Sequence, residues 1–219
     1  MTDKTLTASD ITRLFGGENY KFARWGRPIA PVVFGVTDET LKGLKSAFAT
    51  VLGIANRKMV ETDPELGSNL ILFFVSEWHE VLGIPDLDRL VTGMSDKVAD
   101  LTASGANQYR AFTFDKDGAI RFCAVFVRMG ESQQAASVQT IGTQQMVQSI
   151  LLWADGAFTA ESPVAIIERN DLCIVKPAYA ALIRAAYDPN MPVATNEPAH
   201  ALRLAARTGT LIEAMADET

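Results

Sequence analysis

A long apolar strand and the helix that follows it constrain the fold of this chain more than any other feature. The strand is expected over residues 119–129 (AIRFCAVFVRM) and the helix over residues 137–154. Apolar residues point in nearly every direction around that helix, which is typical of a helix buried on all sides. The sequence therefore predicts that the rest of the chain packs around this strand and helix.

The segments before this unit predict strands that alternate with helices. In chain order they predict a strand at 31–36, a helix at 38–52, a strand at 69–75, a helix at 85–101 and a strand at 108–114. The run NLILFFV at 69–75 does not alternate, which is typical of a strand covered on both faces. Asp117-Gly118 joins the last of these strands to the central one, and Asp-Gly between β-rich runs predicts a hairpin.

The second half of the chain predicts mainly helices. Residues 157–173 contain two short apolar runs and are expected to be irregular. A helix is expected to begin at Pro177, which suits the first turn of a helix. A last helix is expected over 198–216, with Gly209 as a point of interruption.

Domain organisation follows from the length and from the polar start of the chain. A chain of 219 residues can bury a sizeable core. Residues 1–20 predict a loose N-terminal arm with one short helical turn, and residues 21–219 predict a single domain. The order of elements predicts a mixed α/β (α+β) class, in which a mixed sheet packs on helices and the C-terminal half is mostly helical.

Composition and charge exclude two classes of protein. The formal net charge is -6 and the chain has no basic stripe, whereas nucleic-acid binding requires cations that neutralise phosphates. No apolar run is long enough to span a bilayer. The start MTDKTLTASD lacks the apolar stretch of a signal peptide, so the protein is either cytoplasmic or begins after a removed export signal.

The cysteines and histidines predict no metal centre, and no cofactor is expected. Cys123 and Cys173 lie outside any CxxC pair, so they are either two buried thiols or a disulfide. His79-Glu80 matches the first half of an HExxH motif, but Gly83 stands where the second histidine would be. His200 is distant in sequence, whereas zinc needs three or four ligands in one place. Both histidines are expected to be surface or half-buried structural residues.

Amides on the central helix are the main candidates for a binding site. Gln144, Gln145 and Gln148 cluster on one side of the helix at about 100° per residue. Buried amides require hydrogen-bond partners, because an unpaired amide is costly. Two interpretations stay open: the amides pair with backbone or meet solvent, or they line a polar cleft.

Three carboxylates are the candidates for an acid–base site. Glu77 and Glu80 lie near the end of the strand at 69–75 and are either a solvated pair or flank a cleft. Asp155 follows the central helix, where the helix dipole disfavours an anion, so we expect a specific partner for it.

Several stretches together resemble a group of bacterial proteins of unknown function related to the zincin metallopeptidase fold. The resemblance rests on Arg24-Trp25 with Pro28-Ile29, on Asn69-Leu70-Ile71, on the helix that contains Gln145, and on LIRAAYDPNM at 182–191. It covers residues 24–206, and the YDP stretch, which contains Tyr187, is among its most specific parts. The resemblance implies a zincin-like fold and a periplasmic or secreted protein.

The resemblance places the central helix where zincins carry their zinc helix. That helix supplies two histidines four residues apart, and a glutamate beside the first acts as general base. Ile141 and Gly142 would then stand at the first ligand and the glutamate, and Gln145 at the second ligand. Isoleucine and glycine offer no lone pair, and an amide is a poor zinc ligand. The resemblance therefore implies a degenerate, non-catalytic member.

The sequence leaves three functions to weigh. The first is a non-enzymatic binding or interaction module for a peptide or protein, held by pairing with a strand edge. Its candidate binding residues are Gln144, Gln145, Gln148, Asp155 and Tyr187. The alternative is a metallopeptidase-like hydrolase that uses Glu77, Glu80 or Asp155, an interpretation that rests on analogy. The third is a purely structural subunit.

Overall fold

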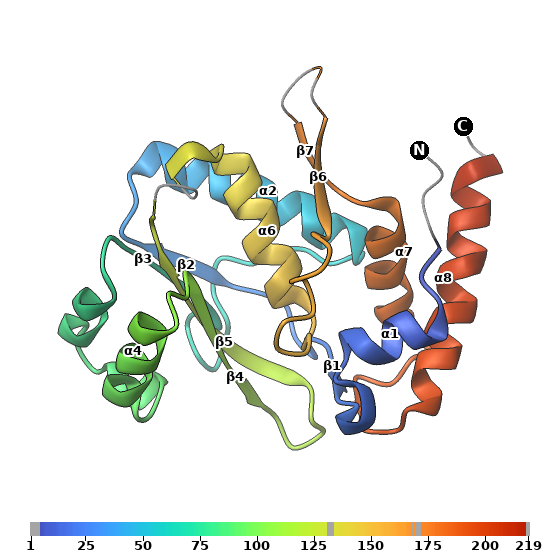
Figure 1. Ribbon diagram of the computed structural model, residues 1–219, viewed down its shortest axis with the longest axis horizontal. Coiled ribbons are helices and arrows are strands. Elements are labelled where there is room, and N and C mark those ends of the chain that lie inside the picture. Colours follow the sequence, from blue (N-terminus) through green and yellow to red (C-terminus); the bar gives the residue numbers. More distant parts are fainter. Residues whose placement is uncertain (1–4, 131–133, 168, 170–171, 218–219) are drawn as a thin grey trace.

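A four-stranded mixed sheet forms the centre of the computed structural model, which describes residues 5–130, 134–167, 169 and 172–217 (Figure 1). Its strands lie in the order β2 (Pro31–Phe34), β3 (Leu70–Val75), β5 (Ile120–Arg128) and β4 (Gln108–Phe114). β2, β3 and β5 are parallel, and β4 is antiparallel to β5. The predicted mixed α/β class and the hairpin of β4 with β5 are confirmed.

Helices and two small sheets cover this central sheet. The helices are α1 (Ala8–Leu14), α2 (Asp38–Ile54), α3 (Leu87–Leu90), α4 (Met94–Ala103), α6 (Val138–Ile150), α7 (Pro177–Ala186) and α8 (Ala199–Asp217), with 3-10 turns η1 (Gly17–Asn19) and η2 (Trp78–Gly83). The small sheets pair β1 (Phe22–Ala23) with β8 (Ala194–Thr195), and β6 (Val164–Ile167) with β7 (Leu172–Val175). Figure 1 shows α1, α7 and α8 together beside the sheet, far from α4.

The sheet separates two hydrophobic clusters. Side chains alternate along a strand, so one face of β5 carries Cys123, Val125 and Val127, which pack in the larger cluster with α2, α6 and α7. The opposite face carries Phe122 and Phe126, which pack with η2, α3 and α4. The central strand is therefore buried on both faces.

Close packing of α2 against α6 depends on two glycines. A Cβ atom on Gly142 would lie 2.7 Å from the Ala47 Cβ, and one on Gly43 would lie 2.7 Å from the Val138 Cγ1. Real Cβ atoms do not approach so closely, because protein interiors are already packed to crystal density. The absence of side chains at these two positions therefore sets the separation of the helices.

Three predicted helices differ from what the sequence indicated. The single helix expected over 85–101 is divided, because Gly93 takes a left-handed φ of 73° at the start of α4. The central helix ends at Ile150 rather than at residue 154. Leu151 is extended and pairs with Arg24, and the Leu152 N–H donates to the Ala23 carbonyl at 2.9 Å. The last helix, α8, continues through Gly209 without the expected interruption.

The N-terminal segment is not the loose arm that its polarity predicts. The Thr7 hydroxyl accepts a hydrogen bond from the Asp10 N–H and so caps α1. Ile11, Leu14 and Phe15 are 0%, 4% and 1% exposed and belong to the larger cluster. The described part of this segment, from residue 5, therefore packs with the rest of the chain; residues 1–4 lie outside the described part.

The segment expected to be irregular, 157–173, carries strand β6 and the start of strand β7. Ala165 pairs with Ile174 and Ile166 with Cys173 in an antiparallel ladder. Residues 168, 170 and 171 of this segment lie outside the described residues. Short apolar runs cannot be assigned by periodicity alone, which is why the sequence did not predict the pair.

The cysteines and one histidine are buried more deeply than a surface role allows. Cys123 and Cys173 are free thiols, so the disulfide alternative is wrong. Burial raises the pKa of both thiols, which makes them weak nucleophiles. His200 is 0% exposed, not half-buried, and its Nδ1 lies 2.8 Å from the Tyr20 hydroxyl. Within the described residues, no helix has the length and apolar character needed to cross a membrane.

Candidate functional site

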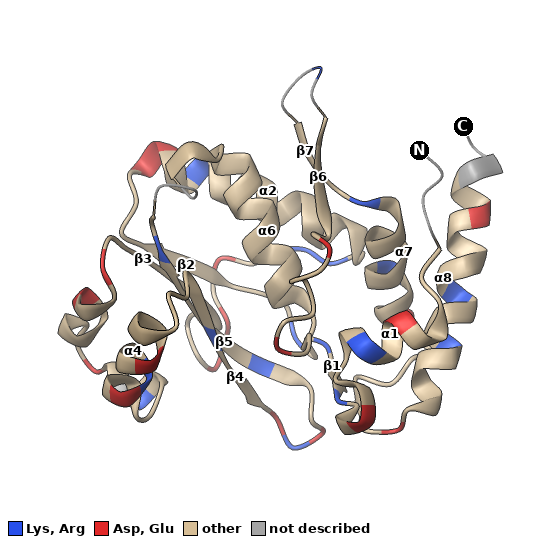
Figure 2. Cartoon of the chain, in the orientation of Figure 1, with Lys and Arg blue, Asp and Glu red and all other residues tan. Residues whose placement is uncertain are grey.

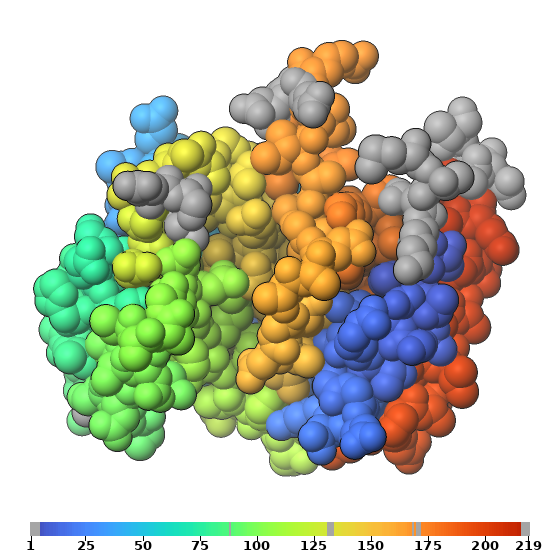
Figure 3. All heavy atoms as spheres, in the orientation of Figure 1, coloured from blue at the N-terminus to red at the C-terminus, as the bar shows by residue number. Residues whose placement is uncertain are grey.

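A cleft of about 1130 Å³ lies between β4, α6 and the segment that follows α6. Figure 3 shows the surface hollowed between the β4 segment in green and the loop after α6 in orange. The N-terminal segment completes the cleft with Phe15, Gly16, Asn19 and Lys21. Its lining thus comes from parts of the chain that are far apart in sequence.

Four of the five predicted binding residues line this cleft. They are Gln144, Gln145, Gln148 and Asp155. The fifth, Tyr187, lies elsewhere: its hydroxyl donates to the Ile150 carbonyl at 2.8 Å and accepts from the Trp25 N–H at 3.3 Å. Tyr187 is 8% exposed and therefore holds the end of α6 rather than a ligand.

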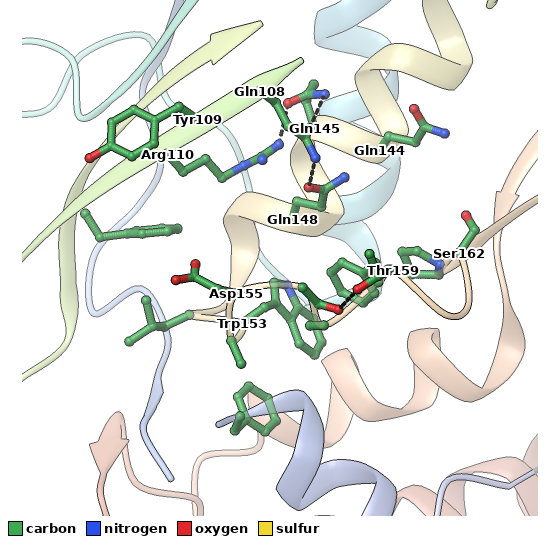
Figure 4. A pocket seen from close by; sticks show the side chains of 18 of the residues that line it. Gln108, Tyr109, Arg110, Gln144, Gln145, Gln148, Trp153, Asp155, Thr159 and Ser162 are labelled. Carbon is green, nitrogen blue, oxygen red and sulfur yellow. Dashed lines mark hydrogen bonds between the residues drawn. The ribbon is translucent and has the colours of Figure 1, made fainter. Parts of the chain in front are cut away.

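The amides of the cleft form a chain of hydrogen bonds between β4 and α6. The Gln145 amide donates to the Gln108 Oε1 at 3.3 Å, and the Gln108 amide donates to the Gln148 Oε1 at 2.9 Å. Figure 4 shows these bonds and shows Gln144 pointing away from them. Gln145 is 5% exposed and satisfied by side chains, so both interpretations of the amides hold in part: they are paired, and they line a cleft.

Arg110 on β4 is the main residue of the cleft that the sequence did not reveal. One terminal nitrogen of its guanidinium donates to the Gln145 Oε1, and its Nε donates to the Ser149 Oγ at 3.4 Å. Burial lowers the pKa of Arg110 to about 10. In the described part of the chain, no carboxylate forms an ion pair with it. The cleft thus holds a protonated guanidinium bound by neutral groups.

Aromatic side chains form the opposite end of the cleft. The Trp153 ring stacks on Phe15 with centroids 5.1 Å apart and an angle of 11° between the planes, and Phe158 meets Trp153 edge to face at 5.1 Å. The Trp153 indole N–H donates to the Val147 carbonyl at 2.8 Å, which fixes the ring. A rigid apolar surface with a satisfied polar edge suits an apolar group of a ligand.

The three candidate carboxylates do not form one site. The Glu80 carboxylate accepts hydrogen bonds from the backbone N–H groups of Ser76 and Glu77 at 3.2 and 3.1 Å, so it caps the turn η2. Neither Glu77 nor Glu80 lines the cleft. Asp155 does line it, but it is exposed and lies beyond the end of α6, away from the helix dipole.

The residues of α6 do not fit a zinc ion. Ile141 and Gln145 face the cleft, and Gly142 faces α2. The described residues contain no group of three or more histidine, cysteine, aspartate or glutamate side chains placed to hold a metal. Amide oxygens are weak zinc ligands compared with imidazole or thiolate. The amides and the guanidinium that line the cleft are suited to hydrogen bonding and charge pairing.

Comparison with known proteins gives no family for this chain. No protein-family model, no curated protein and no solved structure matches it. The described structure supports the mixed α/β class, and a zincin-like fold is not confirmed.

Proposed function

We propose that this chain is a non-catalytic, zincin-like binding protein whose cleft holds an extended peptide segment of a partner protein. The observation that carries the proposal is the position of β4, which is an edge strand of the central sheet and also lines the cleft. Edge strands present unpaired backbone groups that can accept a further strand. The aromatic end and the amides of the cleft then offer sites for the side chains of that strand.

The register of the hairpin identifies the backbone groups that would bind. The Arg128 N–H donates to the Asn107 carbonyl at 2.9 Å. Bonded residues alternate along an antiparallel pair, so Gln108, Arg110 and Phe112 direct their N–H and C=O groups away from β5. No other segment of the described chain occupies these groups. The side chains of the same three residues line the cleft, so a peptide paired here meets both kinds of group.

A matched pair of substitutions at Gln108 tests the pairing. Gln108→Pro and Gln108→Ala both remove the side-chain amide, but only proline also removes the outward N–H. Proline is tolerated at the first residue of an edge strand. We expect peptides selected from a library of random linear peptides on the wild-type protein to bind Gln108→Pro at least about tenfold more weakly than Gln108→Ala, measured by calorimetry.

Equal binding of those peptides to the two variants would contradict edge pairing, and failure to select any linear peptide would contradict the proposed function. The mode of binding has a separate measurement. On peptide binding, the amide protons of Gln108, Arg110 and Phe112 are expected to exchange more slowly with solvent, because each gains a backbone partner.

The non-catalytic part of the proposal predicts the metal content. Protein purified without chelator, loaded with zinc and then dialysed is expected to keep substoichiometric zinc, because Ile141, Gly142 and Gln145 supply no strong ligand. Elemental analysis measures this directly. Stoichiometric zinc that survives dialysis would contradict the proposal.

A further inference from the structure

Arg110 has no carboxylate partner among the described residues, whereas several other arginines do. Five others form ion pairs with carboxylates: Arg13 with Asp10, Arg27 with Asp63 and Glu65, Arg89 with Asp86, Arg121 with Glu65, and Arg207 with Asp188. Arg110 instead donates to the side chains of Gln145 and Ser149. Both of these residues are buried, at 5% and 1% exposure. Arg110 is therefore held in a defined position, and no described residue supplies a counter-charge for it.

A guanidinium that is fixed by neutral side chains and lacks a carboxylate partner can bind an anion. Neutral acceptors offset only part of the free-energy cost of desolvating the guanidinium, because they lack the negative charge of a carboxylate. The guanidinium has five N–H donors, and the two hydrogen bonds in the structure use two of them. The remaining donors allow the forked, two-bond contact that guanidinium makes with carboxylate. With a pKa of about 10, Arg110 stays protonated at neutral pH.

The charge of the cleft opposes that of the whole chain. The formal net charge of the protein is -6, and Figure 2 shows acidic residues on several helices and in the connecting loops. Among the described residues, the charged side chains that line the cleft are Lys21, Arg110 and Asp155, which sum to a positive charge. The Lys21 ammonium lies 4.8 Å from the centre of the Phe114 ring, and so it stays near β4. The cleft is thus a positive site on a negative protein, which favours an anionic ligand.

We infer that the cleft recognises a carboxylate of its peptide, either an acidic side chain or the C-terminal carboxylate, and that Arg110 binds it. This inference rests on the proposed function, since it names the chemistry of the peptide held there. Gln145, which Figure 4 shows beside Arg110, and Ser149 act as positioning residues that hold the guanidinium. Gln108 and Gln148 connect the same network to β4 and complete its hydrogen bonds.

Three small probes test the site without any knowledge of the peptide. N-acetyl-glutamate α-amide carries only a side-chain carboxylate, N-acetyl-alanine carries only a terminal one, and N-acetyl-glutamine α-amide carries neither. We expect at least one of the two acids to shift the Arg110 Nε–H and Gln145 amide resonances saturably, and the neutral probe to leave them unchanged. The acid that binds identifies the source of the carboxylate.

Substitutions of Arg110 then test its role. Arg110→Gln keeps groups that can form hydrogen bonds with Gln145 and Ser149. We expect this variant to bind the acidic probe at least about tenfold more weakly than wild type does. Arg110→Lys keeps the positive charge but cannot make the forked, two-bond contact. Its affinity for the acidic probe is expected to lie between those of wild type and Arg110→Gln. Lys116→Gln removes the same charge from an exposed turn outside the cleft and serves as the matched control. Thermal melting of each variant shows that it is folded.

The outcomes separate this inference from the proposed function. Equal binding of the neutral probe, or unchanged acid binding in Arg110→Gln, overturns the inference even when selected peptides bind at β4. Acid binding at Arg110 in a protein that selects no linear peptide upholds the carboxylate site and overturns the peptide function. With a selected peptide, amidation of its carboxylates is expected to weaken binding to wild type about tenfold and to leave binding to Arg110→Gln unchanged.

Discussion

Gly142→Glu is expected to lower the free energy of unfolding by about 4 kcal/mol or more, and Gly142→Ala by about 1–2 kcal/mol. A Cβ at this position meets the Ala47 Cβ at 2.7 Å and the Leu44 Cα at 3.4 Å, so α2 and α6 must separate. The gain in helix propensity of alanine over glycine, about 1 kcal/mol, offsets only part of this cost. Glutamate adds the burial of a charge without a partner.

Gly209 in α8 is the matched control for Gly142. It also lies inside a helix, but no atom lies within 4 Å of the Cβ that a substitution would add. Gly209→Ala is expected to raise the free energy of unfolding by about 0.5–1 kcal/mol. Denaturant unfolding measures both positions. Equal effects at 142 and 209 would show that the α2–α6 contact is looser than the structure indicates.

The stability of the protein is expected to fall as the pH drops from about 6.5 to 4 because of His200. Burial lowers the pKa of this imidazole from 6.5 to about 4, and Arg203 adds charge repulsion. The unfolded chain therefore takes up a proton at a higher pH than the folded protein. His200 thus favours folding fully above pH 6.5, and this contribution is lost as the pH falls through 4. At 1.36 kcal/mol per pKa unit, the loss reaches about 3 kcal/mol.

His200→Gln isolates this contribution from that of the carboxylates. Glutamine keeps a polar partner for the Tyr20 hydroxyl, which lies 2.8 Å from the His200 Nδ1, but it does not titrate. The free energy of unfolding of the variant is expected to change less between pH 7 and pH 4 than that of wild type. Parallel pH profiles for the two proteins would assign the acid sensitivity to other groups.

Local patterns predicted much of the fold. The spacing of Leu44, Phe48 and Val51 placed the buried face of α2 correctly, because these residues lie on one side of a helix. The patterns did not predict where helices end. α6 ends at Ile150 because Leu151 pairs with Arg24, a contact that joins distant segments and leaves no local signal.

The same distinction explains which cleft residues were predicted. Gln144, Gln145 and Gln148 share one side of α6, and the helical period alone brings them together. Arg110 was missed because its partner Gln145 lies 35 residues away on another element. A signal was present: alternation along β4 places Gln108, Arg110 and Phe112 on one face. Tyr187 was misplaced because the YDP stretch is structural, as its bond to the Ile150 carbonyl shows.

Ligand binding in the cleft is also coupled to the pairing of β1 with β8. Phe15 and Lys21 line it from the N-terminal side, and the same segment is held by the pairing of β1 with β8 near the C-terminus. Pairing two segments that are so distant in sequence has a large entropic cost of loop closure. A ligand that needs this side of the cleft binds only the closed chain, so by mass action it stabilises closure. Occupancy should therefore slow the opening of the β1–β8 pair, and with it the proteolysis of the segments that carry these two strands.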